Sequence, residues 1–236
     1  MIFPDWPAPS RVKSLMTTRD SGVSHAPWAS LNLGDHVGDN PAHVAANRAR
    51  LRQKLPSEPG WLQQVHSATV VETGVGVPEA DASFTRQAGT VSAVLTADCL
   101  PVLFCDPAGS VVAAAHAGWR GLAGGVLEAT VAAMRAPPGD ILAWMGAAIG
   151  PQAFEVGFDV RQTFVAQHPA AAAAFIQHAP DKWLADIYQL ARIHLNHDGV
   201  LAVYGGGRCT FKETDSFFSY RRDGVTGRMA SLIWLE

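Results

Sequence analysis

The sequence has 236 residues, of which 48% are hydrophobic and 17% are charged, and its formal net charge is −3. These values exclude a disordered chain and favour a packed globular protein with one large core over two small domains. We therefore predict a single domain over residues 1–236. The weak negative charge and the absence of Lys/Arg runs argue against nucleic-acid and membrane partners.

The first ten residues, MIFPDWPAPS, lack the basic and apolar regions of a secretory signal, and no apolar run is long enough to span a bilayer. Three cysteines without a Cys-x-x-Cys pair do not make a disulfide framework. We expect a soluble cytoplasmic protein with reduced thiols, either a monomer or a weak homodimer.

The N-terminal part contains one predicted helix. Residues 1–35 are rich in Pro, Ser and Gly and predict short strands and turns, after which Asn40 caps a helix that begins at Pro41. Arg48 falls on the apolar stripe of this helix, about 40° from Val44. The arginine therefore either forms an ion pair or reaches solvent along the surface, or it binds an anion through its guanidinium.

Three strand-like segments follow, at residues 61–73, 90–106 and 110–118. They are rich in Val, Leu, Phe and Ala, which favours buried strands. Pro101 lies inside the second segment and predicts a bulge or break there, because proline cannot donate a hydrogen bond in a sheet.

The C-terminal half alternates helices and strands. Helices are predicted at residues 121–136, at 160–178 with a break at Pro169, and at 182–199. Strands are predicted at residues 141–151, 200–207 and 216–236. Mixed elements throughout the chain predict an α/β or α+β fold with mixed sheets.

The stretch AAAHAGWRG, residues 113–121, ends a buried strand in His116 and continues through glycines that flank Arg120. A helix that begins just beyond this turn would present free N–H groups beside the arginine, which favours anions. On its own, however, a histidine at the end of a strand is more often structural than catalytic.

His116 has two potential partners in neighbouring segments, Cys99 and His66. Together the three side chains match a catalytic zinc site with three protein ligands and an open position for water. Cys99 and His116 also match a nucleophile with its base, and Cys99 alone matches a small buried hydrophobe. The residue pattern leaves these three interpretations open.

Several further polar residues have two interpretations each. Asp81 orients a ligand histidine or caps a turn, and Arg221 and Arg222 reach the site or form an exposed pair. His194 and His197, three residues apart on a predicted helix, have a spacing that can chelate a metal. We favour solvated or capping histidines for this pair.

Six motifs, in order, resemble those of the YfiH-like laccase-domain family, from about residue 22 to the C-terminus: LNLGDHVGDN, QVHS, TADCLPVLF, AAAHAGWRG, GAAIGPQAFEVG and SYRRDGVTGRMASLIWL. TADCLPVLF together with HAGWRG is highly specific. One departure is ADASFT, where the family more often has a bulky aliphatic residue after ADA. The family is also described as polyphenol oxidase, purine nucleoside phosphorylase and peptidoglycan editing factor.

The resemblance implies a four-layer α/β/β/α fold like that of deamidase toxin domains with a Cys–His pair, which are cysteine-hydrolase-type proteins. It implies that His66, Cys99 and His116 are both the catalytic residues and the metal ligands, with zinc as the metal and copper as an alternative. The substrate or phosphate contacts that it implies are Asn32, Arg48 and Arg120.

The activity that the resemblance implies is phosphorolysis of adenosine, inosine, guanosine and S-methyl-5′-thioadenosine, together with adenosine deamination. The partners are then purine nucleosides and phosphate, and Asp98 or a nearby carboxylate would move protons during deamination. Two alternatives remain: a Cys–His amide hydrolase acting on peptidoglycan precursors, and a copper-dependent polyphenol oxidase. We rank the oxidase low, because none of the nine histidines forms a His-x-His pair.

Overall fold

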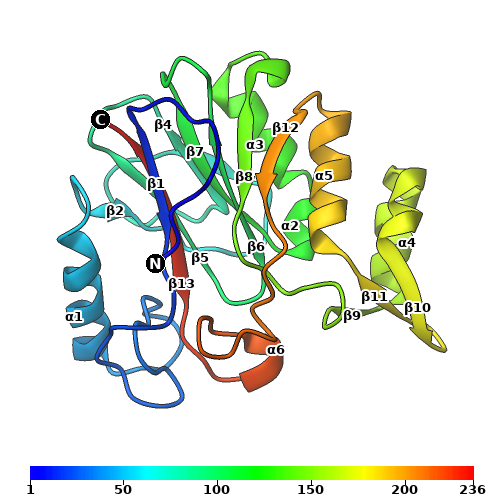
Figure 1. Cartoon of the computed structure of the whole chain (residues 1–236), viewed down its shortest axis with the longest axis horizontal. Helices are drawn as coiled ribbons and strands as arrows, with labels where there is room; N and C mark the ends of the chain where they lie inside the picture. Colours follow the sequence, from blue (N-terminus) through cyan, green and yellow to red (C-terminus); the bar gives the residue numbers. More distant parts are fainter.

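Two β-sheets packed against each other form the centre of the molecule, which the computed structural model describes over residues 1–236 (Figure 1). The smaller of the two has the order β1-β13-β5-β2. Its strands are β1 (Val12–Met16), β13 (Met229–Leu235), β5 (Val91–Thr96) and β2 (Pro59–Gly60). The last strand of the chain, β13, therefore lies between the first strand and β5, and it is antiparallel to both.

The larger sheet has six strands in the order β12-β8-β6-β7-β4-β3. These strands are β12 (Ala202–Gly205), β8 (Leu142–Met145), β6 (Leu100–Cys105), β7 (Val112–Ala117), β4 (Ala82–Thr85) and β3 (Val70–Glu72). The two pairs at its edges are parallel and the inner pairs are antiparallel, so the sheet is mixed. A separate three-stranded sheet contains β10 (Phe175–Ala179), β11 (Lys182–Ala185) and β9 (Glu155–Gly157).

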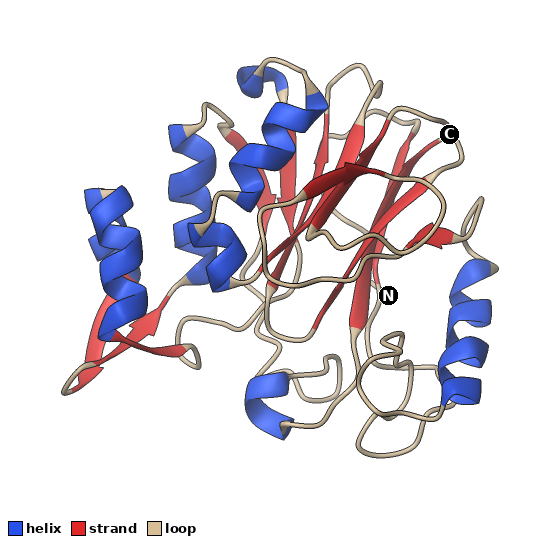
Figure 2. Cartoon of the chain, turned by 180° about the vertical axis from the view of Figure 1, so that it is seen from behind, coloured by secondary structure: helices blue, strands red, loops and turns tan.

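Helices lie outside both central sheets (Figure 2). Helices α3 (Val126–Met134) and α5 (Ile187–His197) pack on the six-stranded sheet, whereas α1 (Pro41–Arg52) packs on the four-stranded sheet. The remaining helical elements are α2 (Trp119–Ala123), α4 (Phe158–Gln167), α6 (Tyr220–Asp223) and the 3-10 turns η1 (Pro138–Asp140) and η2 (Pro169–Ala174). None of the helices combines the length and the apolar character needed to cross a membrane.

Burial on both faces explains why the central strands are continuously apolar. In β6, Leu100, Val102 and Phe104 face the core beneath α3 and α5, whereas Leu103 and Cys105 face the core between the two sheets. This alternation follows from the two-residue period of a strand. A strand that is covered on both sides needs apolar residues at every position, so its sequence shows no polar–apolar alternation.

The mixed α/β fold is confirmed, and so is one local prediction. The Asn40 side chain accepts a hydrogen bond from the Ala42 N–H at 2.9 Å and caps α1. A break is present near Pro101 but precedes it: residues 97–99 are irregular, and there the chain leaves the four-stranded sheet and enters the six-stranded one, whereas Pro101 itself lies in β6 opposite His116. The relation to the deamidase toxin domains stays a prediction.

Other element predictions were wrong. Residues 121–136 form two helices, because Gly125 adopts a left-handed conformation with φ of 87° and interrupts the helix. Residues 175–179 and 182–185 are strands rather than helix, because they pair with each other across a tight turn. Most of residues 61–69 have no regular structure, so His66 lies in a loop instead of a strand.

Candidate metal centre and active site

A cavity of about 560 Å³ lies where the chain passes between the two sheets. Its wall contains His66 from the loop before β3, Cys99 from the break between β5 and β6, and His116 near the end of β7. Its volume is in the range of pockets that hold small organic ligands. Three segments that are distant in sequence therefore contribute polar side chains to one concave site.

His66, Cys99 and His116 lie close enough to share a metal ion. Their ligand atoms are all within 4.8 Å of one another. Cys99 Sγ is 3.7 Å from His66 Nε2, and the rings of His66 and His116 are 4.8 Å apart between centroids. Two imidazoles and one thiolate form a donor set that suits zinc or copper.

Asp81 holds two of these three residues in place. Its fully buried carboxylate accepts hydrogen bonds from His116 Nδ1 at 2.8 Å, from the His66 N–H at 2.9 Å and from the Ser67 N–H at 2.6 Å. Because an ionised carboxylate only accepts, His116 keeps a proton on Nδ1, so Nε2 is the nitrogen that would bind a metal in place of its own proton. Asp81 thus orients the histidine instead of only capping a turn.

The backbone at His66 also depends on this carboxylate. His66 has φ of 62°, a left-handed conformation that is unfavourable for residues other than glycine. The two hydrogen bonds that Asp81 accepts from the N–H groups of residues 66 and 67 stabilise this turn. The turn carries the His66 side chain to the sulfur of Cys99.

The electrostatics of the site favour a thiolate beside an imidazolium. Burial alone raises the pKa of Cys99, but the charge of His116 and hydrogen bonds from His116 and His66 lower it to about 6. Burial likewise opposes the charge on His116, yet Cys99 and Asp81 raise its pKa to about 9. For Asp81, hydrogen bonds from His116 and Ser67 outweigh the effect of burial and lower the pKa to about 2. The thiolate is the form of cysteine that binds metals and attacks carbonyl carbons.

Gly118 leaves the space that a shared metal needs. A Cβ at this position would lie 2.9 Å from Cys99 Sγ and 2.8 Å from His66 Cδ2. Its backbone angles, φ of −63° and ψ of 159°, are open to any residue, so the requirement for glycine is one of space. A His2Cys donor set, a carboxylate on His116 and this free space together fit a resident metal ion.

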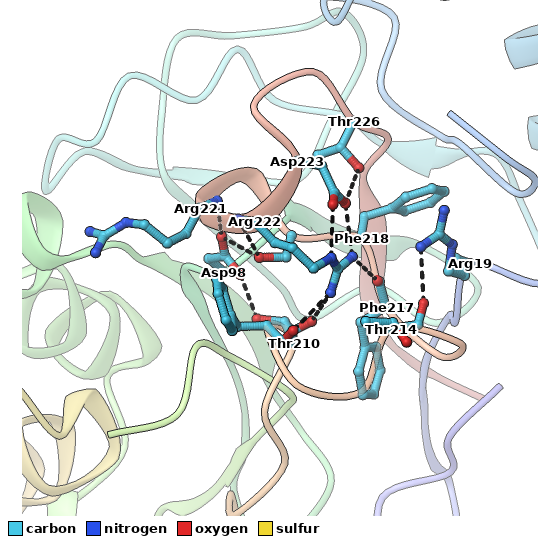
Figure 3. A network of polar contacts seen from close by, with 12 residues as sticks. Arg19, Asp98, Thr210, Thr214, Phe217, Phe218, Arg221, Arg222, Asp223 and Thr226 are labelled. Carbon is cyan, nitrogen blue, oxygen red and sulfur yellow. Dashed lines mark hydrogen bonds and ion pairs between the residues drawn. The ribbon is translucent and has the colours of Figure 1, made fainter. Parts of the chain in front are cut away.

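Asp98, next to Cys99, has a structural function. Its carboxylate accepts hydrogen bonds from the Thr210 hydroxyl at 2.6 Å, the Ser219 hydroxyl at 3.0 Å and the Arg221 N–H at 2.7 Å (Figure 3). Both oxygens are therefore already occupied, and the geometry does not favour Asp98 as a proton carrier. These bonds attach α6 to the chain at Cys99.

Arg221 and Arg222 differ in their surroundings. Arg222 pairs with Asp223 and donates to the carbonyl groups of Thr210, Phe211 and Phe217 (Figure 3). These bonds hold the loop that precedes α6 in place. Arg221 instead lines the cavity, and its guanidinium donates to the Glu155 carbonyl at 2.9 Å. Only the first arginine of the pair is placed to meet a ligand.

Two further arginines line the same cavity. Arg120 is exposed and lies over the ring of Trp119, 4.4 Å from its centroid. Arg228 is half-buried and donates to the carbonyls of Thr226 and Gly227. Sequence reasoning missed Arg228 as a site residue, although it lies inside the motif SYRRDGVTGRMASLIWL.

Asn32 and Arg48, the other expected substrate contacts, do not line the cavity. Asn32 is buried and binds backbone groups of Gly34 and Arg228 together with the carboxylate of Asp39. Arg48 Nε donates to the Leu33 carbonyl at 3.0 Å, and Nη2 is 3.2 Å from an oxygen of Asp35. These contacts match the ion-pair interpretation of Arg48, and its role as a substrate contact stays a prediction, as does that of Asn32.

Comparison with known proteins places the whole chain in one family. The profile of the family described as multi-copper polyphenol oxidoreductase laccase matches residues 13–236. A Pseudomonas aeruginosa protein named purine nucleoside phosphorylase PA4543 is 57% identical over 237 residues, covering 100% of this chain and 98% of the relative. An Escherichia coli protein named purine nucleoside phosphorylase YfiH is 58% identical over 241 residues, with the same coverage.

Solved structures give the same result. The crystal structure of the Neisseria meningitidis protein NMB0706 superposes with a TM-score of 0.97 at 56% identity, covering 100% of this chain and 98% of that one. The structure of YlmD from Geobacillus stearothermophilus gives 0.90 at 33% identity, with 98% and 94% covered. The chain therefore belongs to the multi-copper polyphenol oxidoreductase laccase family, as the six motifs indicated.

Proposed function

We propose that this protein is a purine nucleoside phosphorylase, with adenosine deaminase activity at the same site. One observation carries the proposal: a single cavity combines the His66–Cys99–His116 cluster with the three arginines Arg120, Arg221 and Arg228. The arginines of this cavity suit the binding of phosphate, and its metal-binding cluster suits the activation of a polar group. The relatives named purine nucleoside phosphorylase support the same activity.

The walls of the cavity suit a nucleoside. Phe154, Ile149 and Ile187 are buried and apolar, and Tyr220 and Trp119 add aromatic faces on which a purine ring can stack. This apolar surface excludes water from the sugar, which favours attack by phosphate over attack by water. Adenosine, inosine, guanosine and S-methyl-5′-thioadenosine are the substrates that we propose.

In phosphorolysis, a phosphate oxygen bonds to C1′ of the ribose while the bond from C1′ to the purine nitrogen breaks. The products are ribose 1-phosphate and the free base. Arg120 and Arg228 hold the phosphate through charge-assisted hydrogen bonds and align it with C1′. Their fixed charges also attract the phosphate dianion into the cavity.

In deamination, water replaces the amino group at C6 of adenosine and ammonia leaves. Zinc, or copper as the alternative, would be held by His66, Cys99 and His116. The metal would act as a Lewis acid on a molecule bound in the cavity. Asp81 keeps His116 in the tautomer that binds a metal. Cys99 contributes a negative charge, since its low pKa keeps it a thiolate near neutral pH.

The deciding experiment is metal analysis of freshly purified protein together with adenosine turnover, with and without phosphate and before and after chelation. We expect about one equivalent of zinc at this cluster, ribose 1-phosphate only when phosphate is present, and inosine without it. Both products should disappear on chelation and return with Zn²⁺. Protein that retains metal but turns over no nucleoside would refute the proposal.

A second candidate, a Cys–His amide hydrolase, is favoured by the pKa values of Cys99 and His116. Cys99 with a pKa of about 6 beside His116 with a pKa of about 9 is an arrangement that also activates cysteine nucleophiles. A hydrolase of this kind would attack an amide such as one in a peptidoglycan precursor. A covalent acyl group on Cys99 that forms after complete chelation would favour it over the phosphorylase.

A further inference from the structure

A second cluster of metal-binding side chains lies on the opposite side of the six-stranded sheet from the four-stranded one. Glu128 is on α3, His194 is on α5, and His168 is at the junction of α4 and η2. Their ligand atoms all lie within 4.8 Å of one another. None of the three residues lines the cavity of the proposed active site.

The centre of this cluster is a buried hydrogen-bonded pair, His194 and Glu128, with unused polar atoms. His194 is 2% exposed, and its Nδ1 is 2.6 Å from Glu128 Oε1. His194 Nε2 and Glu128 Oε2 are buried as well, and neither has a hydrogen-bond partner in the protein. Buried polar atoms are nearly always paired, so two unpaired atoms in one cluster need an explanation.

The chemistry of the two unpaired atoms is that of electron donors. With the proton of His194 on Nδ1, facing the carboxylate, Nε2 carries a lone pair, and so does Oε2 of Glu128. Two lone pairs cannot satisfy each other, whereas a cation can bind either of them. A cation that takes the place of the Nδ1 proton of His194 would have both this nitrogen and the Glu128 carboxylate as ligands.

Further imidazoles surround this pair. The ring of His168 is 4.7 Å from that of His194 and 4.5 Å from that of His197, between centroids. His197 is exposed and can turn toward the cluster, so a fourth ligand is available. Imidazole and carboxylate ligands without a thiolate suit zinc, cobalt or nickel.

We propose that Glu128, His168 and His194 form a second site for a divalent transition-metal ion, which joins α3, α5 and the end of α4. Ligand atoms in a tetrahedral zinc site are about 3.4 Å apart, so ligand atoms that lie no more than 4.8 Å apart need to close by at most about 1.4 Å. His168 is half-exposed and on a turn, which permits such a movement. The ion has a structural function, because its three ligands come from three different elements, of which α3 and α5 are otherwise joined by the single hydrogen bond between Glu128 and His194 and by side-chain packing.

The test is to count the metal ions that bind to the full chain. Protein stripped by chelation and dialysed against Zn²⁺ is expected to contain two zinc ions, and Cys99→Ala is expected to contain one. Adding His168→Ala to Cys99→Ala should remove the remaining ion. Adding His178→Ala instead is the matched control, because the His178 side chain is 54% exposed and lies outside both clusters.

Co²⁺ distinguishes the two sites by spectroscopy. The Cys99 site gives a thiolate-to-cobalt charge-transfer band, whereas the Glu128 site, without sulfur, gives only ligand-field bands. Cys99→Ala should therefore bind one Co²⁺ without the charge-transfer band. Glu128→Gln provides a second variant of nearly the same shape, and circular dichroism verifies that each variant is folded.

The structural function has its own measurement. In the Cys99→Ala background, Zn²⁺ should raise the melting temperature and slow amide hydrogen exchange in residues 158–168. Neither change should occur in the variant that also lacks His168. If Cys99→Ala binds no metal, or if His168→Ala and Glu128→Gln leave its stoichiometry at one, the proposal is wrong, whatever the protein does to nucleosides.

Discussion

Asp81 holds His116 by two hydrogen bonds, one from the side chain and one from the backbone. The carboxylate of Asp81 accepts from Nδ1 at 2.8 Å, and its carbonyl oxygen accepts from the His116 N–H at 2.7 Å. The second bond extends the pairing of β4 with β7 by one residue. The position of the strand and the orientation of the imidazole are therefore set by the same residue.

This relationship predicts the effect of Asp81→Asn. The amide still fills the space, but it lacks the negative charge that holds the Nδ1 proton of His116. We expect metal affinity at the His66 cluster to fall about 10–100-fold, the usual effect of losing a carboxylate behind a ligand histidine. Competition with a chromophoric chelator measures the change.

Asp106→Asn is the control for that experiment. Asp106 is also buried, and its carboxylate accepts hydrogen bonds from the N–H groups of Ser110 and Val111 in a turn after β6. Its replacement should lower thermal stability without changing metal affinity. Equal losses of affinity in the two variants would mean that Asp81 acts only through stability.

The pKa of Cys99 predicts a pH dependence of alkylation in metal-free protein. A thiol with a pKa of about 6 is mostly thiolate at pH 7, with about ten thiolates for each thiol. The rate of reaction with iodoacetamide should therefore fall as the pH drops through 6 and stay constant above pH 7. The measurement needs a Cys209→Ser background, because Cys209 is also partly accessible.

Two comparisons make the pH experiment decisive. Burial and the charge of Asp106 raise the pKa of Cys105 to about 12, so that residue should remain unmodified. His116→Gln removes the imidazolium and should move the midpoint of the Cys99 profile upward, toward the ordinary value of 9.0. An unchanged midpoint in His116→Gln would show that another group lowers this pKa.

Gly118→Ala tests the space between the metal ligands. The new methyl group would meet Cys99 Sγ at 2.9 Å and His66 Cδ2 at 2.8 Å. Forcing a methyl group into packed surroundings costs about 1–3 kcal/mol, and the ligands must move apart to relieve it. We expect loss of stoichiometric zinc from the cluster. Gly139→Ala, where a Cβ meets no atom within 4 Å, should bind zinc like the wild type.

The phosphate site is tested by comparing Arg120→Ala with Arg48→Ala. Arg120 lines the cavity, whereas Arg48 is engaged by Leu33 and Asp35 outside it. Loss of a charge-assisted contact should raise the KM for phosphate at least about tenfold in Arg120→Ala and leave deamination nearly unchanged. If Arg48→Ala has the larger effect on the KM for phosphate, the phosphate binds at Arg48, as the family resemblance implied.

The sequence predicted the strands of the core better than the helices around them. Continuous apolar runs identified β5, β6 and β7, because burial on both faces leaves no polar position in such strands. Residues 175–178 and 182–185 were predicted as helical, yet they lie in the two strands of a hairpin. This hairpin is stabilised by the pairing of β11 with β9, and the periodicity of a local sequence does not reveal a pairing with a distant segment.

The candidate site was predicted only in part for a similar reason. Motifs and residue types pointed to His66, Cys99 and His116, which the structure brings together. Arg228 was missed, because its place beside Cys99 depends on the path of the chain after α6. His194 was predicted as solvated or capping, which was wrong. It is buried against Glu128, a partner 66 residues earlier in the chain.

The position of β13 determines when the protein can fold during synthesis. β1 and β5 have no hydrogen bonds to each other and are joined only by residues 229–235. The ribosome must therefore release those residues before the four-stranded sheet can close, long after β5 has been made. The hydrogen bonds that Asp98 accepts from Ser219 and Arg221 also form only after those residues have been made. A nascent chain thus carries the unpaired edges of β1 and β5 until residues 229–235 have been released, and chaperones that cover exposed strands are most useful during that interval.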